Sequence, residues 1–384
     1  MKILYYLDGL NRGGVEIIVS QLANFFCENG NEIHIIYLYK DMHDLIDEFS
    51  SDVKIHPLPF INKKTPYFQY IKYLWRLVRL LKNIQPEIIH AHNSSFSYFY
   101  LALAVYLAKL RSENIRTLHF MGFFLEKKSW IDKVRFFFDK KASELLQSSI
   151  VSVSANIKSY VDDNYPLNHS VLITNGIDSK KIINTNTTKE SLGINVNGFI
   201  GIYTSRLCEG KNHRLLIQAW SKVVESYPSA LLILIGDGPL RLECQDYCRE
   251  LGISNNVLFT GSISNVGDYL RIADIGVFPS ESEGFGLGLC EMMAAGLPVV
   301  ASDIPAFRLM IQDGNNGVFF DTYDSDDLSN KIIIILGDKK VRDELGKNAN
   351  KYILENYTLQ SMLEKYQNLY HEIKKINKEC WLEY

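Results

Sequence analysis

The stretch that decides the fold is residues 275–302, which read IGVFPSESEGFGLGLCEMMAAGLPVVAS. The apolar run at 275–279 predicts a buried strand, and a second run at 298–301 predicts another. Between them, a glycine-containing loop leads into a helical pattern at 288–295. Strands that alternate with helices in this way form parallel sheets whose faces are covered by the helices.

The same alternation continues in both directions along the chain. Further strand patterns occur at 199–204, 230–235 and 257–260, and in the first half at 3–7, 33–39, 55–58, 87–91, 115–119 and 149–154. Helical patterns separate them, including 15–28, 67–83, 130–146, 215–226 and 241–251. A length of 384 residues suits two domains. We therefore predict two Rossmann-like, doubly wound α/β domains, residues 1–175 and 176–357, joined at the polar stretch 175–197.

Composition excludes several classes of protein. The chain carries 41 Lys and Arg against 44 Asp and Glu, a net charge of −3, which argues against a nucleic-acid binder driven by bulk charge. Its six cysteines include no CxxC pair, so we expect reduced thiols. The N-terminal apolar run is too short for a signal peptide, and the apolar stretch 96–110 is shorter than the roughly 20 residues of a spanning helix. We expect a cytoplasmic protein, soluble or peripheral.

The loop and helix within residues 279–298 carry the strongest chemical signal. Gly284 and Gly286 let the backbone N–H groups of 285–287 approach an anion at a helix N-terminus. Glu283 and Glu291 provide carboxylates that accept hydrogen bonds from sugar hydroxyls. The alternative is that Glu283 caps a helix and Glu291 lies on a solvated face. That alternative explains neither the glycines nor the second acid, so the segment indicates a sugar-nucleotide site.

The seven-residue spacing from Glu283 to Glu291 inside PSESEGFGLGLCEMMAAGLPVVAS resembles the signature of family 4 glycosyltransferases. These are retaining enzymes of the two-domain GT-B fold. The resemblance covers most of the chain and is strongest in the second half. It implies an acceptor-binding first domain, completed by a final helix at about 358–384, and a donor-binding second domain. It also implies donor contacts by the backbone of Phe285, Gly286 and Leu287 and by Glu291, with Glu283 at the reaction centre.

Two cations follow the strand at 199–204. Arg206 and Lys211 would neutralise the charge on a departing nucleoside diphosphate. Taken alone, they are as easily two solvated surface cations. The resemblance implies that both contact the donor diphosphate. It also places Asp237 and Gly238, which follow the strand at 230–235, near the nucleotide base, although a plain turn is the alternative there.

The first domain offers glycines and histidines after its strands. Gly13 and Gly14 lie between a strand and a helix; no GxGxxG or GK[ST] pattern accompanies them, and an ordinary turn is the alternative. By the resemblance, this loop lines the cleft opposite the donor diphosphate, and His119 lies beside the donor sugar. His92 matches a histidine of the same cleft, and with Asn93 it is the candidate acceptor contact. For any single histidine, a structural hydrogen bond is the alternative. Strand alternation predicts that His90 and His92 point the same way.

Metal dependence is not expected. Asp324-Ser-Asp326-Asp327 is similar to the DxD metal motif of the other glycosyltransferase fold, but it precedes a helical run at 328–336 and predicts an N-cap cluster. No carboxylate–histidine cluster has the spacing of metal ligands. We expect neither a metal nor another cofactor, the nucleotide sugar being a co-substrate.

Residues 61–141 carry 15 Lys and Arg but only five Asp and Glu, with aromatic residues interleaved. Basic amphipathic segments of this kind suit an anionic membrane surface, here the inner face of the cytoplasmic membrane. A solvated charged face with core aromatics is the alternative. No nucleic-acid motif accompanies the charge.

The expected function is retaining transfer of a sugar from a nucleotide sugar to a hydroxyl of a glycan or polyprenyl-linked acceptor. A UDP-sugar is favoured by its frequency in the family, and cell-surface polysaccharide biosynthesis by the same analogy. No protein nucleophile is evident, which favours front-face attack. A GT-B sugar-nucleotide epimerase and a non-catalytic sugar-nucleotide-binding protein are the alternatives.

Overall fold

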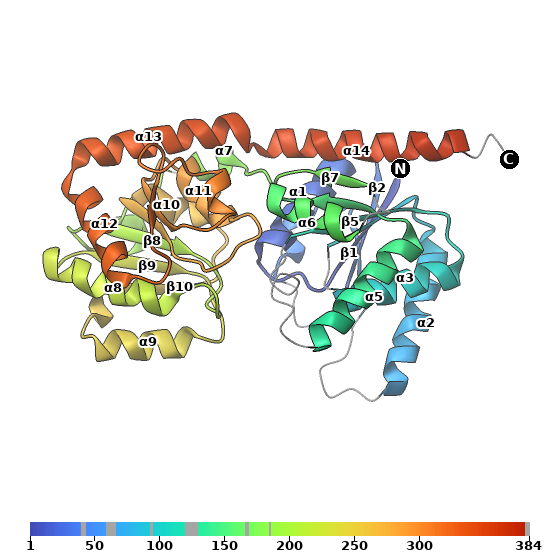
Figure 1. The fold of residues 1–384 in the computed structure, drawn as a ribbon, viewed down its shortest axis with the longest axis horizontal. Coiled ribbons are helices and arrows are strands. Elements are labelled where there is room, and N and C mark those ends of the chain that lie inside the picture. Colours follow the sequence, from blue (N-terminus) through green and yellow to red (C-terminus); the bar gives the residue numbers. More distant parts are fainter. Residues whose placement is uncertain are drawn as a thin grey trace. The chain divides into compact units, whose positions relative to one another are not determined.

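The computed structural model describes residues 1–39, 44–58, 67–92, 95–119, 130–165, 169–183 and 186–380. The chain divides into two compact units: Met1–Thr174 together with Met362–Tyr384, and Asn175–Ser361. Figure 1 shows helices flanking the strands in each unit. Both units are parallel α/β sheets, as the alternation of strands and helices predicts.

The described strands of the first unit form one parallel sheet in the order β3-β2-β1-β4-β5-β6-β7. Its near-continuous apolar strands are typical of a sheet buried on both faces; in β1 only the first residue is not buried. The strand order reverses between β1 and β4. These two strands lie side by side although 80 residues of sequence separate them. The strands are β1 Lys2–Leu7, β2 Glu32–Tyr37, β3 Lys54–Pro57, β4 Ile88–Ala91, β5 Glu113–Leu118, β6 Ser149–Ser152 and β7 Ser170–Leu172.

The helices of the first unit cover this sheet. They are α1 Gly14–Glu28, α2 Tyr67–Ile84, α3 Ser95–Ala108, α5 Trp130–Leu146 and α6 Ala155–Asn164, with a 3-10 turn at Ile46–Glu48. The last helix, α14 (Leu359–Cys380), packs on the same sheet from Met362 onward. There Tyr370 stacks on Phe26 and Tyr366 bonds Thr117 of β5.

The second unit repeats the plan with the strand order β10-β9-β8-β11-β12-β13. The order reverses between β8 and β11. Tight packing fixes helix α8 (His213–Ser226) on β8, because a side chain at Gly201 would overlap the ring of buried Trp220. The strands are β8 Ile200–Thr204, β9 Leu231–Ile235, β10 Val257–Gly261, β11 Ile275–Phe278, β12 Val299–Ser302 and β13 Val318–Phe320.

The helices of the second unit are α7 Ser179–Ile183, α8 His213–Ser226, α9 Arg241–Glu250, α10 Val266–Ile272, α11 Leu287–Ala294, α12 Ser325–Gly337 and α13 Lys339–Asn356. Short 3-10 turns lie at Glu190–Leu192, Ser254–Asn256 and Phe307–Leu309. The predicted N-cap cluster is confirmed: the Asp324 carboxylate accepts from the N–H groups of Asp326 and Asp327 at 2.8 and 3.0 Å.

In open parallel sheets, ligands bind beyond the carboxyl ends of the strands where the order reverses. A ligand is therefore expected beside the chain segments that follow β1 and β4 in the first unit, and β8 and β11 in the second. Among the described residues, no helix combines the length and apolar character needed to span a bilayer.

Candidate active site

Three predicted donor residues lie on the two segments that leave the reversal point of the second sheet. Arg206 and Lys211 follow β8, and Glu283 follows β11. Because β8 and β11 are hydrogen-bonded neighbours, their carboxyl ends meet at one edge of the sheet. The topology thus brings together residues that are more than 70 positions apart in the sequence.

Lys211 and Glu283 form an ion pair. The distance from Lys211 Nζ to Glu283 Oε1 is 2.5 Å, and Ser280 Oγ donates to the same carboxylate oxygen at 2.9 Å. The side chains are only 22% and 14% exposed, so the pair is partly shielded from water. Glu283 therefore positions the lysine and does not cap α11, which has Gly286 at its N-cap and no side-chain cap.

Buried Tyr203 ties this pair to the sheet. Its hydroxyl donates to the Lys211 carbonyl at 2.9 Å and lies 3.0 Å from Ser280 Oγ. Sequence reasoning missed both Tyr203 and Ser280. The available signal was their position in the sequence. Tyr203 lies in the mostly apolar strand β8, and Ser280 comes two residues after the end of β11.

The residue after Lys211 has an unusual backbone conformation. Asn212, the N-cap of α8, adopts φ +57°, in the left-handed region that asparagine tolerates better than most residues other than glycine. Its side-chain amide donates to the Thr322 carbonyl at 3.2 Å, which helps to hold that geometry. The Gly210 carbonyl accepts from the Glu281 N–H at 2.9 Å and joins the loops after β8 and β11. The loop conformation is thus fixed on both sides of the lysine.

Arg206 differs from Lys211 in being exposed. Its side chain makes no ion pair or hydrogen bond within the part of the chain that the structure describes. A guanidinium without a partner at the edge of the sheet is available to an anion, and its planar donors match a phosphate in two-point contact.

The start of α11 lies against the end of β8. A Cβ atom on Gly288 would stand 2.4 Å from Thr204 Oγ1, so only glycine allows this approach. Gly286 has φ +93°, in the region that favours glycine, and a side chain there would meet the ring of Phe307. Buried Phe285 packs edge-on against Tyr357. The first-turn N–H groups of a helix lack partners within it. This turn, which includes Leu287, therefore offers N–H donors and the positive end of the helix dipole, a combination that favours an anion.

Glu291 lies one turn into α11 and is half-buried. Loss of water around its carboxyl group raises its pKa from 4.5 to about 7. Among the described residues it has no hydrogen-bond or ion-pair partner. A fully solvated surface acid would not have its pKa raised by burial, so this unpartnered carboxyl group suits an acceptor for ligand hydroxyls.

The turn after β9 approaches the loop after β8. A Cβ atom on Gly238 would lie 2.2 Å from the Leu207 carbonyl oxygen, so the two backbones touch. Asp237 Oδ1 accepts from the Gly238 N–H at 2.7 Å, and its other oxygen lies 3.3 Å from Arg241 Nη1. The predicted base-side residues thus adjoin the Arg206 segment.

In the first unit, the loop after β1 ends in the predicted glycines. Gly13 is the N-cap of α1 with an extended backbone, and exposed Gly14 is the first residue of the helix. Asp8, at the beginning of the loop, accepts from Ser97 Oγ of α3 at 2.5 Å. The loop is also held near its glycine end, where Arg12 pairs with Glu48 at 3.0 Å and the Glu16 carboxylate lies beside Gly13.

Two histidines of the first unit meet beyond β4 and β5. His92 Nδ1 lies 2.9 Å from His119 Nε2. The prediction that His90 and His92 point the same way is confirmed, since their ring centroids are 4.0 Å apart. Burial lowers the pKa of His119 to about 4 and that of His92 well below 6.5, so both rings are neutral at pH 7. Asn93 lies outside the described residues.

Within the described ranges, no group of three or more His, Cys, Asp or Glu side chains is arranged to hold a metal ion. The groups assembled at the second sheet are instead two cations, two carboxylates and a helix N-terminus. This set suits a ligand that combines a diphosphate with sugar hydroxyls.

Comparison with known proteins defines the class. Two family models match consecutive parts of the chain: "Glycosyltransferase Family 4" over residues 12–181 and "Glycosyl transferases group 1" over residues 184–352. The fold is that of a GT-B glycosyltransferase. The chain belongs to the family 4 glycosyltransferases, as the Glu283–Glu291 spacing predicts.

Relatives of known function align along nearly the whole chain. The N-acetyl-alpha-D-glucosaminyl L-malate synthase of Bacillus anthracis is 25% identical over 382 residues, which cover 95% of this chain and 96% of that protein. The UDP-Gal:alpha-D-GlcNAc-diphosphoundecaprenol alpha-1,3-galactosyltransferase of Escherichia coli is 25% identical, covering 96% and 95%. Among solved structures, Anabaena HepE in complex with UDP-glucose superposes with a TM-score of 0.81 at 19% identity, covering 97% of this chain and 100% of HepE.

Proposed function

We propose that the protein is a retaining, metal-independent glycosyltransferase that moves a sugar from a nucleotide sugar to a hydroxyl of a glycan or polyprenyl-linked acceptor. The observation that carries the proposal is the Lys211–Glu283 pair at the reversal point of the second sheet, beside the N-terminus of α11. We further propose that the second unit holds the donor and the first unit holds the acceptor.

In this proposal Arg206, Lys211 and the first turn of α11 bind the pyrophosphate of the donor. Glu291 accepts from donor hydroxyls and Glu283 keeps Lys211 oriented beside the reaction centre. Gly13, Gly14 and His119 face the donor from the first unit, and His92 and Asn93 belong to the acceptor side.

The proposed reaction is front-face attack, because the described site offers no nucleophile aligned with a base. The bond between the anomeric carbon and the phosphate oxygen breaks as the acceptor oxygen bonds to that carbon on the same face. The acceptor proton passes to an oxygen of the leaving diphosphate. Arg206 and Lys211 stabilise the charge that develops there.

A UDP-sugar is the favoured donor and a surface-polysaccharide precursor the favoured acceptor. Two similarities support this choice: the HepE structure holds UDP-glucose, and the E. coli relative by its name uses UDP-Gal and a diphosphoundecaprenol acceptor.

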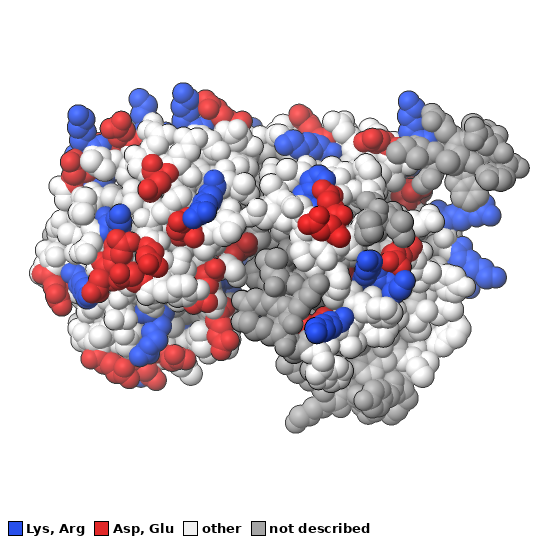
Figure 2. All heavy atoms as spheres, viewed as in Figure 1, with Lys and Arg blue, Asp and Glu red and all other residues white. Residues whose placement is uncertain are grey.

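Attachment to the inner face of the cytoplasmic membrane is part of the proposal. In α2, the residues on the exposed face are Ile71, Lys72, Trp75, Arg76, Arg79 and Lys82, and the helix contains no acid. Ile71 and Trp75 are 62% and 60% exposed, and Trp130, which begins α5, is 73% exposed. Figure 2 shows Lys and Arg side chains projecting along the right-hand edge of the first unit. Large apolar side chains interleaved with cations suit an anionic interface.

Residues 61–66, 93–94 and 120–129 of the predicted basic region lie outside the described chain.

Product analysis tests the reaction. The protein is incubated with UDP- and GDP-sugars, with and without membrane lipid extract and with and without EDTA. The proposal expects a new α-linked glycoside, identified by NMR of the anomeric centre, that forms only with acceptor and persists in EDTA. A β-linked product from an α-linked donor would contradict retention. Conversion of the donor without acceptor would indicate an epimerase, and donor binding without any product would indicate a binding protein.

A further inference from the structure

His92 is buried, and among the described residues only one of its ring nitrogens has a hydrogen-bond partner. It is 7% exposed, and its Nδ1 lies against His119 Nε2. Its Nε2 is buried and has no partner within the described part of the chain. Neighbouring His90 is different, since its two ring nitrogens meet the hydroxyls of Tyr370 and Thr117 at 2.6 and 2.8 Å. The hydrogen-bonding capacity of His92 is thus directed at His119 alone.

The unpartnered Nε2 of His92 decides which of the two rings donates in the His92–His119 hydrogen bond. Both rings are neutral, so one nitrogen of each carries hydrogen and the other carries a lone pair. If His119 donated to His92, the hydrogen of His92 would sit on buried Nε2 as an orphaned N–H, which folded proteins rarely tolerate. If His92 donates through Nδ1, its buried Nε2 is only an unused acceptor. The second arrangement is favoured, and it leaves the hydrogen of His119 on Nδ1.

This atom of His119 is available to a ligand. The residue is half-buried, and its Nδ1 has no partner in the part of the chain that the structure describes. We propose that His92 is a positioning residue that fixes His119 as the Nδ1–H tautomer, so that His119 offers an N–H donor, not a lone pair, to a sugar oxygen. The role toward sugar rests on the proposed function; the tautomer does not.

Nitrogen-15 NMR of the full-length protein, recorded without substrate at pH 7, reads the tautomer directly. Two-bond nitrogen–proton correlations distinguish Nδ1–H from Nε2–H rings, and a His119→Gln variant assigns the His119 signals by their loss. The proposal expects the Nδ1–H pattern for His119. An Nε2–H pattern, or averaging between the two forms, would overturn it, whether or not any donor is turned over.

Substitution then tests the positioning. His92→Leu removes the donor and should shift His119 toward the Nε2–H form, with a fall in kcat of about 10–100-fold, the range seen when an orienting partner is lost. The KM for the donor should change little. Unchanged kcat in a variant whose His119 tautomer has shifted would refute the positioning role.

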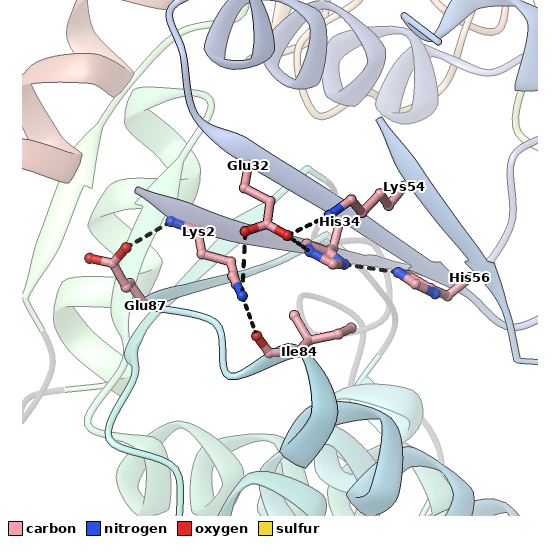
Figure 3. A network of polar contacts seen from close by, with 7 residues as sticks. All are labelled: Lys2, Glu32, His34, Lys54, His56, Ile84 and Glu87. Atoms are coloured by element: carbon pink, nitrogen blue, oxygen red, sulfur yellow. Dashed lines mark hydrogen bonds and ion pairs between the residues drawn. The ribbon is translucent and has the colours of Figure 1, made fainter. Parts of the chain in front are cut away.

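The His34–His56 pair supplies a matched control. Figure 3 shows it in the first unit, on β2 and β3, with His34 Nδ1 2.9 Å from His56 Nε2 and His34 Nε2 bonded to Glu32. His34 is also buried, at 5% exposure. His34→Leu removes a comparable imidazole contact and should leave the His119 signals and kcat unchanged. A shift of the His119 signals in this control as well would show that the effect of His92→Leu is general loosening, and would overturn the proposal.

Discussion

Lys211 is the residue on which the chemistry depends most. Its ammonium group is held by Glu283, its carbonyl by Tyr203, and the next residue, Asn212, is in a left-handed conformation. These contacts hold the lysine at its ammonium group and at its backbone, which indicates that its position matters.

We expect Lys211→Ala to lower kcat/KM by 10²–10³-fold, because one preorganised contact to developing charge contributes about 3 kcal/mol. Lys222→Ala is the matched control: Lys222 lies in the same unit and pairs with exposed Asp326. The control should retain full activity, and both variants should fold, as judged by circular dichroism. Equal activities of the two variants would remove Lys211 from the mechanism.

Glu291 predicts a pH dependence of donor binding. With a pKa of about 7, its carboxyl group is mostly protonated at pH 6 and mostly ionised at pH 8. The ionised form accepts hydrogen bonds from hydroxyls with both oxygens, so donor affinity should rise as pH increases through 7.

Calorimetric titration of the donor between pH 6 and 8 measures this effect. In Glu291→Gln the amide does not titrate, so affinity should be lower at pH 8 and independent of pH. A wild-type affinity that stays constant across this range would contradict the assigned role of Glu291.

At the scale of elements, apolar periodicity predicts most of the long strands and helices, but it misses the 18-residue helix α13. It misses β7 and β13, which are three residues each, because apolar runs this short do not distinguish a strand from a loop. It also omits α6, although Ser154 before it accepts from the Ile157 N–H and is an ordinary N-cap signal.

The exposed face of α2 gives a prediction at this scale. Ile71→Ser with Trp75→Ser should weaken binding to anionic phospholipid vesicles severalfold, since each removes a large apolar side chain from an interface. Binding should fall with salt and be weak on zwitterionic vesicles. Co-sedimentation measures both.

Ile334→Ser on α12 is the control, because Ile334 is 65% exposed in the other unit. It should bind vesicles as the wild type does. Equal losses in the control and the α2 variant, or no binding by the wild type, would exclude α2 as the attachment face.

For the whole molecule, alternation of strands and helices is sufficient to predict two parallel α/β sheets, and the Glu283–Glu291 spacing is sufficient to identify the family. Strand order is not readable from alternation, because it depends on which helices cross which face. Only the folded order shows that β8 and β11 are neighbours, and therefore that Lys211 meets Glu283. The sequence likewise predicts the same role for Arg206 and Lys211. In the structure, Arg206 is exposed and Lys211 is ion-paired with Glu283.

The central claim is that the second unit holds a nucleoside diphosphate at the reversal point of its sheet. A crystal structure of the protein with UDP bound tests it most directly. We predict that the diphosphate contacts Arg206, Lys211 and the first-turn N–H groups of α11, with the base toward Asp237 and Gly238. A diphosphate bound well away from positions 206, 211 and 286–289 would contradict the account.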